Sequence, residues 1–229
     1  MKNVAYSSEY LDYRKQFDYI FVDEYKNGDS EVKQLSDGKH TLITSFYRDE
    51  SRKVLHFNAY TSKTEVYDCN RNKVAEFRNI DHSVDFFSEV EHSNGKKYLL
   101  FSIDLYGYSI MDLSSYKTYH YIPEESFKDH KETFIWTDVL YCRKNNILAV
   151  DGCIWACPSS TYFYDFSTPE ELPYYLIYST YDMDGEINID TDAIPLNWNE
   201  DGAIVLKCCV GVNGEERIEK TIDIVSRRK

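Results

Sequence analysis

Short apolar and aromatic runs alternate with polar turns along most of the chain. A typical run is "KKYLLFSIDL" at residues 96–105, which is followed by a second run after one turn. Tyr, Val, Ile and Phe dominate these runs, and such residues favour strands. No segment shows a long 3.6-residue apolar period, so we expect at most a turn or two of helix, at residues 7–16 or 124–131. Tight hairpins that need positive φ are marked by three dipeptides, Asn94-Gly95, Asn145-Asn146 and Asp201-Gly202. The pattern predicts an all-β protein.

A degenerate repeat underlies this pattern. Four runs end on an aspartate, and the spacings between these aspartates are 44, 53 and 58 residues. Each unit is predicted to contain a strand, a turn and three further strands. Four-stranded units repeated at about 40–50 residues are typical of β-propeller blades. The predicted units cover residues 40–80, 83–123, 134–179 and 192–226 of a single domain, residues 1–229.

The repeated aspartates resemble the Trp-Asp position of WD-repeat propellers. They are Asp68, Asp112, Asp165 and Asp223, and Tyr, Met, Tyr and Ile precede them instead of Trp. The Gly-His part of that family's signature is not evident. The resemblance implies that each aspartate ends the third strand of a blade and braces neighbouring turns by hydrogen bonds. It also implies a small propeller of four or five antiparallel blades.

The last unit lacks a clear fourth strand. We therefore expect an N-terminal strand from residues 17–38 to complete it, because closure removes an exposed sheet edge. A twisted β-sandwich or an open sheet is the alternative fold.

Charge limits the classes of partner. The formal net charge of −13 repels phosphate backbones and anionic lipids, so we expect neither nucleic-acid nor membrane binding. Residues 145–206 contain 11 acidic residues and no Lys, Arg or His. The simpler interpretation is a solvated face that basic residues elsewhere in the chain neutralise. The alternative is a site for a cation or for a basic protein or peptide as partner.

Cysteine content and hydropathy indicate a compartment. The N-terminus has no apolar core of signal-peptide length, and no apolar run could span a bilayer. Six cysteines in 229 residues are too few for a disulfide scaffold. We therefore expect free thiols and a cytoplasmic location.

The stretch "AVDGCIWACPSS", residues 149–160, carries two cysteines around a tryptophan. We interpret it as the second strand of the third unit, with Cys153, Trp155 and Cys157 on one face. Gly152 then marks a bulge or a close approach of the neighbouring blade. A zinc site is disfavoured because no second Cys or His pair lies at a suitable spacing. A redox pair is disfavoured because no cation or helix N-terminus lies nearby.

The stretch "YDMDGEINIDTD", residues 181–192, matches part of a calcium-loop pattern. Thr180 and Thr191 replace two of the ligands that a complete loop would have. An acidic loop with an Asp-Gly turn is the simpler interpretation, and no other cofactor is expected. The candidate ligands are Asp182, Asp184, Asn188 and Asp190.

Aromatic and acidic residues are predicted at the rim from which propellers bind ligands. Packing of the tryptophans between blades is the alternative interpretation. The candidate binding residues are Tyr60, Tyr106, Trp136, Asp138, Asp151 and Trp155.

Two functions follow from these candidates. The first is a non-enzymatic platform whose acidic face binds a basic protein or peptide. The second is a propeller-type hydrolase acting on a carbohydrate or small polar substrate, with Asp104, Asp138 and Asp151 as its channel-mouth carboxylates. No nucleophile-elbow, P-loop or dinucleotide motif is present.

Overall fold

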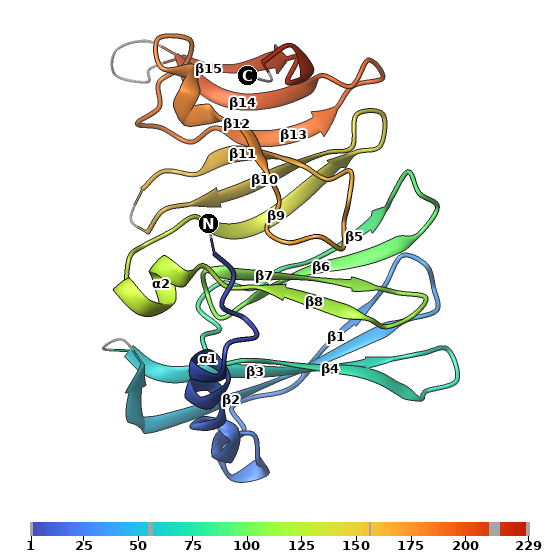
Figure 1. Ribbon diagram of the computed structural model, residues 1–229, viewed down its shortest axis with the longest axis vertical. Helices are drawn as coiled ribbons and strands as arrows, with labels where there is room; N and C mark the ends of the chain where they lie inside the picture. Colours follow the sequence, from blue (N-terminus) through green and yellow to red (C-terminus); the bar gives the residue numbers. More distant parts are fainter. Residues whose placement is uncertain (1, 55–56, 156, 211–215, 228–229) are drawn as a thin grey trace.

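The computed structural model describes residues 2–54, 57–155, 157–210 and 216–227. Over these residues the chain forms four antiparallel sheets, which follow one another in chain order along the long axis of the molecule (Figure 1). The first sheet contains β1 (Glu31–Gln34), β2 (Thr41–Val54), β3 (Phe57–Tyr67) and β4 (Lys73–Asn79). The second contains β5 (Phe87–Glu91), β6 (Lys97–Ile103), β7 (Gly107–Asp112) and β8 (Thr118–Tyr121). The all-β prediction is confirmed.

The third and fourth sheets continue this order. The third contains β9 (Ile135–Cys142), β10 (Ile147–Cys153), β11 (Ser160–Asp165) and β12 (Leu176–Ser179). The fourth has three strands among the described residues, β13 (Ile194–Trp198), β14 (Ile204–Val210) and β15 (Glu216–Ile222).

Helices are few and short. The two predicted helical segments form α1 (Ser8–Lys15) and α2 (Glu124–Asp129). Ser7 caps α1 by accepting a hydrogen bond from the backbone N–H of Tyr10 at 3.2 Å. Within the described residues no helix is long and apolar enough to cross a membrane. The 3₁₀ turns are η1 (Asp18–Ile20), η2 (Asp23–Tyr25), η3 (Thr180–Met183) and η4 (Val225–Arg227).

A residue with positive φ forms the first turn of every sheet. The φ values are 66° at Gly38, 85° at Gly95, 50° at Asn146 and 84° at Gly202. The Asp37-Gly38 turn carries the same sequence signal as the three predicted turns, but it was not recognised as the start of a unit. The first sheet therefore begins at Glu31 and not at residue 40.

The predicted closure by an N-terminal strand is wrong. β1 pairs with β2 of the first sheet, with Glu31 opposite Thr44 and Gln34 opposite Thr41. The physical reason is local, because the Asp37-Gly38 turn closes a short loop, whereas the last sheet lies at the far end of the molecule (Figure 1). The other predicted N-terminal strand, at residues 17–25, forms η1 and η2 instead. Among the described residues the fourth sheet has the order β13-β14-β15, and no N-terminal strand joins it.

The repeated aspartates brace a turn in each sheet. β3, β7, β11 and β15 are the third strands, and each ends at its aspartate or one residue before it. In every case the carboxylate accepts the backbone N–H two residues further along, as in an Asx-turn. The distances are 2.8 Å at Asp68, 2.8 Å at Asp112, 2.9 Å at Asp165 and 3.0 Å at Asp223.

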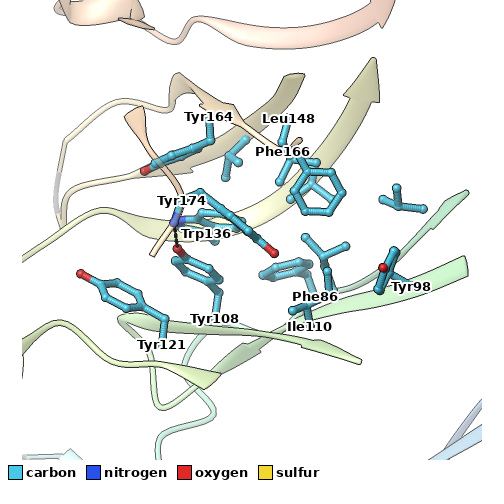
Figure 2. Packing of buried hydrophobic residues seen from close by; sticks show 14 residues of the cluster. Phe86, Tyr98, Tyr108, Ile110, Tyr121, Trp136, Leu148, Tyr164, Phe166 and Tyr174 are labelled. Carbon is cyan, nitrogen blue, oxygen red and sulfur yellow. Dashed lines mark hydrogen bonds between the residues drawn. The ribbon is translucent and has the colours of Figure 1, made fainter. Parts of the chain in front are cut away.

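Apolar clusters hold the sheets together. Between the second and third sheets, Trp136 of β9 stacks on Tyr108 of β7 with 4.0 Å between ring centroids (Figure 2). Tyr174, from the loop between β11 and β12, packs against both rings, and its backbone N–H donates to the Tyr108 hydroxyl. The rings share a large buried cluster, so the second and third sheets form one core.

The cysteine stretch is only partly a strand. β10 ends at Cys153, and its register with β9 shifts between Asp151 and Gly152, as predicted. A Cβ on Gly152 would lie 2.1 Å from the carbonyl oxygen of Ile135, so the close approach comes from β9. The predicted continuation of the strand beyond Cys153 is wrong. A turn replaces it, and Trp155 in that turn is 46% exposed.

We expect Asp112→Ala to reduce the free energy of unfolding by about 1–3 kcal/mol, because the N–H groups of Ser114 and Ser115 and the ammonium of Lys96 lose a buried acceptor. Burial raises the pKa of Asp112, but hydrogen bonds from Ser114 and Lys96 outweigh burial and hold it well below its ordinary value. A carboxyl group with a lowered pKa in the folded state stabilises above its unfolded pKa of about 3.9 and ceases to do so as pH falls further. Urea unfolding at pH 7 and pH 3 should therefore show a smaller difference from wild type at pH 3.

Asp223→Ala is the matched control. Asp223 makes the same turn contact on the surface, so its loss should cost about 0.5 kcal/mol or less. Equal losses in the two variants would contradict the importance of the buried aspartate.

Candidate functional site

A cavity of about 480 Å³ opens where α1, α2 and the loops after β4 and β6 meet. The two helices touch across it, because the rings of Tyr10 and Phe127 lie 5.3 Å apart. Four aromatic residues line the cavity, namely Tyr10, Tyr13, Tyr106 and Phe127. Three acidic residues also line it, Glu9, Asp81 and Asp104. This volume is typical of sites for small ligands or single side chains.

Asp104 fixes α1 as one wall of the cavity. Its carboxylate accepts hydrogen bonds from the Tyr10 hydroxyl, the Arg14 guanidinium and the backbone N–H of Ile80. Arg14 also donates to the carbonyl oxygen of Arg78. Burial raises the pKa of Tyr10 well above its ordinary value, and the charge of Asp104 adds to this effect. Because the Asp104 carboxylate already has three donors, it holds the wall in place and has little capacity left for a ligand.

Unusual backbone conformations gather at the same cavity. Asp104, Leu105 and His130 have positive φ values of 49°, 55° and 53°, and all three line it. Aspartate tolerates this region, but leucine rarely occupies it. Such strain costs about 1–3 kcal/mol per residue and tends to occur at functional sites. The hydrogen bond from the Asp104 N–H to Asn79 Oδ1, at 2.8 Å, helps to hold the turn.

Asp81 provides the cavity with negative charge that no described Lys or Arg pairs with. Its carboxylate accepts the N–H and hydroxyl of Ser83, at 3.1 and 2.5 Å, and it forms no ion pair with a described Lys or Arg. Burial raises the pKa of Asp81 more than the bonds from Ser83 lower it. Burial also raises the pKa of Tyr106, with further contributions from Glu132 and Asp81. Aromatic faces beside uncompensated carboxylates attract a cation.

The lining of the cavity includes an ion pair between the two helices. Lys128 of α2 lies 3.7 Å from Glu9 of α1 and 3.0 Å from Glu124. Both Lys128 and Glu9 are exposed, so this pair contributes little to stability. Lys128 partly offsets the charge of Glu9, and it forms no ion pair with Asp81.

The predicted binding residues do not share one surface. Tyr106 lines the 480 Å³ cavity, and it shares a smaller cavity of about 40 Å³ with Trp136. Trp136 is only 3% exposed and packs between two sheets, as the alternative interpretation predicted. Tyr60 is 39% exposed on β3, under the guanidinium of Arg48. Trp155 is also exposed, in the turn after β10.

Asp138 and Asp151 are cross-strand neighbours on β9 and β10. Asp138 accepts the hydroxyl of Ser88 at 2.6 Å, and Asp151 accepts the hydroxyl of Thr137 at 3.1 Å. Burial raises the pKa of Asp151, and the charge of Asp138 adds to the increase. Neither carboxylate lines the 480 Å³ cavity.

The predicted calcium loop is occupied by local hydrogen bonds. The Asp182 carboxylate accepts the N–H and hydroxyl of Ser179, at 3.0 and 2.9 Å, and so caps η3. Asn188 Oδ1 accepts the N–H of Asp190 at 3.0 Å. Among the described residues no group of three His, Cys, Asp or Glu side chains is placed to hold a metal ion. Calcium binding by Asp182, Asp184, Asn188 and Asp190 stays a prediction.

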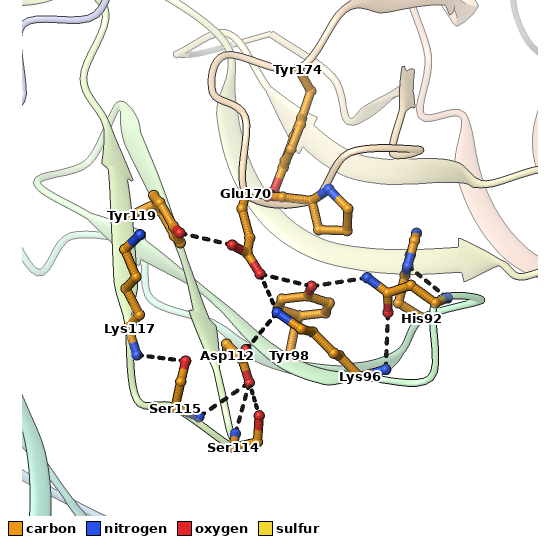
Figure 3. A network of polar contacts seen from close by, with 12 residues as sticks. His92, Lys96, Tyr98, Asp112, Ser114, Ser115, Lys117, Tyr119, Glu170 and Tyr174 are labelled. Atoms are coloured by element: carbon orange, nitrogen blue, oxygen red, sulfur yellow. Dashed lines mark hydrogen bonds and ion pairs between the residues drawn. The ribbon is translucent and has the colours of Figure 1, made fainter.

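Basic residues from elsewhere neutralise part of the acidic stretch. Glu170 pairs with Lys96 at 2.7 Å and accepts the hydroxyl of Tyr119 at 2.8 Å (Figure 3). Glu186 pairs with Arg227 at 2.7 Å and with Lys220 at 3.0 Å. For these two acids the neutralised-face interpretation holds.

Comparisons with known proteins assign no family. No family model matches the chain. An uncharacterized protein, R762, of Acanthamoeba polyphaga mimivirus is 36% identical over 66 residues, which cover 29% of this chain and 26% of that protein. The chain thus matches about a quarter of the length of this relative. TolB from Acinetobacter baumannii aligns with 86% of this chain and 44% of its own, at 12% identity and a TM-score of 0.35.

Arg14→Met should lower the free energy of unfolding by about 3–5 kcal/mol, because it leaves the buried Asp104 carboxylate without its cation. Arg14→Lys should recover little, since one ammonium group cannot reproduce the two-sided contact to Asp104 and Arg78. Urea unfolding measures the loss, and hydrogen exchange in α1 shows whether the helix is released.

Lys15→Met is the control on the same helix, because Lys15 pairs with Asp12 on an exposed surface and its loss should leave the free energy of unfolding nearly unchanged. The proposed role of Asp104 would be contradicted if Arg14→Met behaved like this control.

Proposed function

We propose that the protein is a non-enzymatic interaction module that binds a basic protein segment and inserts one cationic side chain into the 480 Å³ cavity. The observation that supports this function is the combination of four aromatic rings with Asp81, whose charge no described Lys or Arg pairs with. Tyr106, one of the candidate binding residues, lies in this wall.

The net charge of the protein also supports a basic segment as the partner. The net charge of −13 attracts a basic segment and accelerates its encounter with the protein. Exposed acids that form no ion pair with a described Lys or Arg include Asp184, Asp190, Glu200 and Asp201. A basic segment anchored in the cavity would be steered by this field.

The architecture suits a binding scaffold. We propose that each sheet is a propeller-type blade of the degenerate WD-like kind, because an aspartate braces the turn after every third strand. The six cysteines, all in the described part of the chain, are free thiols, which supports a cytoplasmic location within this proposal.

The hydrolase interpretation has weaker support. Asp104 is occupied by Arg14, Tyr10 and Ile80, and Asp138 and Asp151 lie outside the lining of the large cavity. A glycosidase needs two carboxyl groups facing one substrate-sized space. We therefore favour the interaction module.

A lysine-rich decapeptide should bind, and its dissociation constant should rise several-fold between 50 and 500 mM salt, because the attraction is electrostatic. Asp81→Asn should weaken binding about 5–10-fold, equivalent to about 1–1.4 kcal/mol. Since a cation favours the ionised form of Asp81, whose pKa is raised, affinity should fall as pH decreases through the acidic range. Isothermal titration calorimetry at several pH values measures all three effects.

Asp201→Asn is the matched control, because it removes the same charge from the exposed turn between β13 and β14. Salt-independent binding, or equal effects of the two variants, would argue against the cavity as the binding site.

A further inference from the structure

We infer that the cavity between α1 and α2 is selective for a methylated ammonium group over an unmodified lysine or arginine side chain. This inference rests on the proposed function and names the chemistry of the group that enters the cavity. It follows from the arrangement of the aromatic rings, from the small number of free hydrogen-bond acceptors and from the volume of the cavity.

The aromatic rings approach the cavity from three separate segments. Tyr10 and Tyr13 come from α1, Phe127 from α2 and Tyr106 from the loop between β6 and β7. The plane of Phe127 makes angles of 87° with Tyr10 and 57° with Tyr13, at centroid distances of 5.3 and 5.6 Å. Phe127 therefore packs directly on both α1 rings, and Tyr106 adds a ring from a third segment of the lining. A cation in the cavity can contact aromatic residues from more than one segment, as in sites for quaternary ammonium groups.

Few carboxylate oxygens of the cavity remain for an entering group. Asp104 already accepts from Tyr10, Arg14 and Ile80. Glu9 lies beside Lys128, and Asp81 accepts both bonds from Ser83 at Oδ1, which leaves Oδ2 of Asp81 to contact a cation. A primary ammonium carries three N–H donors and a guanidinium carries five, and each donor loses a water partner on entry. A trimethylammonium group has no N–H donor, so it retains the charge without this cost.

Charge and size fit the same group. Burial raises the pKa of Tyr106 most, and the charges of Glu132 and Asp81 raise it further, so two carboxylates act on this wall. The cavity volume of about 480 Å³ has room for a trimethylammonium head together with several methylene groups. The group could belong to a methylated lysine of a protein or to a free small molecule such as choline. The shared chemistry is the alkylated ammonium ion, and we favour the protein side chain because of the proposed function.

The test is calorimetric titration of the full-length protein with four probes. These are a lysine-rich decapeptide, the same peptide with one trimethyllysine, free trimethyllysine and choline. We expect the trimethylated peptide to bind at least about tenfold more tightly than the unmodified one. Tyr106→Leu and Phe127→Leu should remove most of this preference, whereas Tyr106→Phe should keep it, because the ring remains.

Tyr175→Leu is the control variant, since Tyr175 is 71% exposed and lies outside the cavity lining, and it should leave binding unchanged. Thermal unfolding of every variant separates loss of the ring from loss of the fold.

Each outcome decides between the two proposals. Equal affinity for both peptides, with sensitivity to Asp81→Asn, overturns the methyl selectivity and leaves the proposed function standing. Binding of choline without either peptide supports the alkylated-ammonium site and overturns the protein source. Absence of binding by all four probes overturns both proposals.

Discussion

The carboxylate of Asp104 is the contact on which the cavity depends. It joins three parts of the chain that are distant in sequence, since its donors come from α1 and from the end of the first sheet, and Asp104 itself follows β6 of the second sheet. Arg14 reinforces the connection by donating to the carbonyl oxygen of Arg78. A buried charge is tolerated only when it is paired and hydrogen-bonded, so the Asp104 carboxylate requires the three segments to remain together. The helix that this contact holds carries Glu9, Tyr10 and Tyr13 into the cavity wall.

The remainder of the molecule forms a rigid support for this site. Each sheet repeats the same two devices, a positive-φ residue in the first turn and an aspartate after the third strand. Aromatic stacking between Tyr108 and Trp136 then fixes the second sheet to the third. The loop between β11 and β12 strengthens this junction, because Tyr174 fills the core while Glu170 pairs with Lys96 outside it (Figures 2 and 3).

Much of the fold was predictable because its signals are local. The turns at Gly95, Asn146 and Gly202 follow from short dipeptides, and Gly152 follows from a glycine inside a strand pattern. The predicted start of the first unit, at residue 40, is wrong because the Asp37-Gly38 turn lies far from the first repeated aspartate. The long β2–β3 hairpin separates the two and obscures the repeat. The segment at residues 17–25 was mistaken for a strand because its aromatic residues pack on the sheet from 3₁₀ turns.

The candidate site was much harder to predict. Of its aromatic wall, only Tyr106 was among the expected binding residues, and Asp104 was considered only as a catalytic acid. The wall is assembled from α1, α2 and two loops, and the contact between Arg14 and Asp104 spans 90 residues. No residue spacing or sequence motif predicts a contact between residues so far apart in the chain. The acidic stretch drew attention to residues 145–206, whereas the uncompensated Asp81 lies in the first half of the chain.

An NMR experiment on the protein mixed with tetramethylammonium tests most directly whether the cavity between α1 and α2 binds an alkylated ammonium ion. We expect intermolecular NOEs from the methyl protons to the ring protons of Tyr13, Tyr106 and Phe127, which line the cavity. NOEs confined to exposed rings such as Tyr60, Trp155 or Tyr175, or no NOEs at all at a saturating concentration, would contradict it.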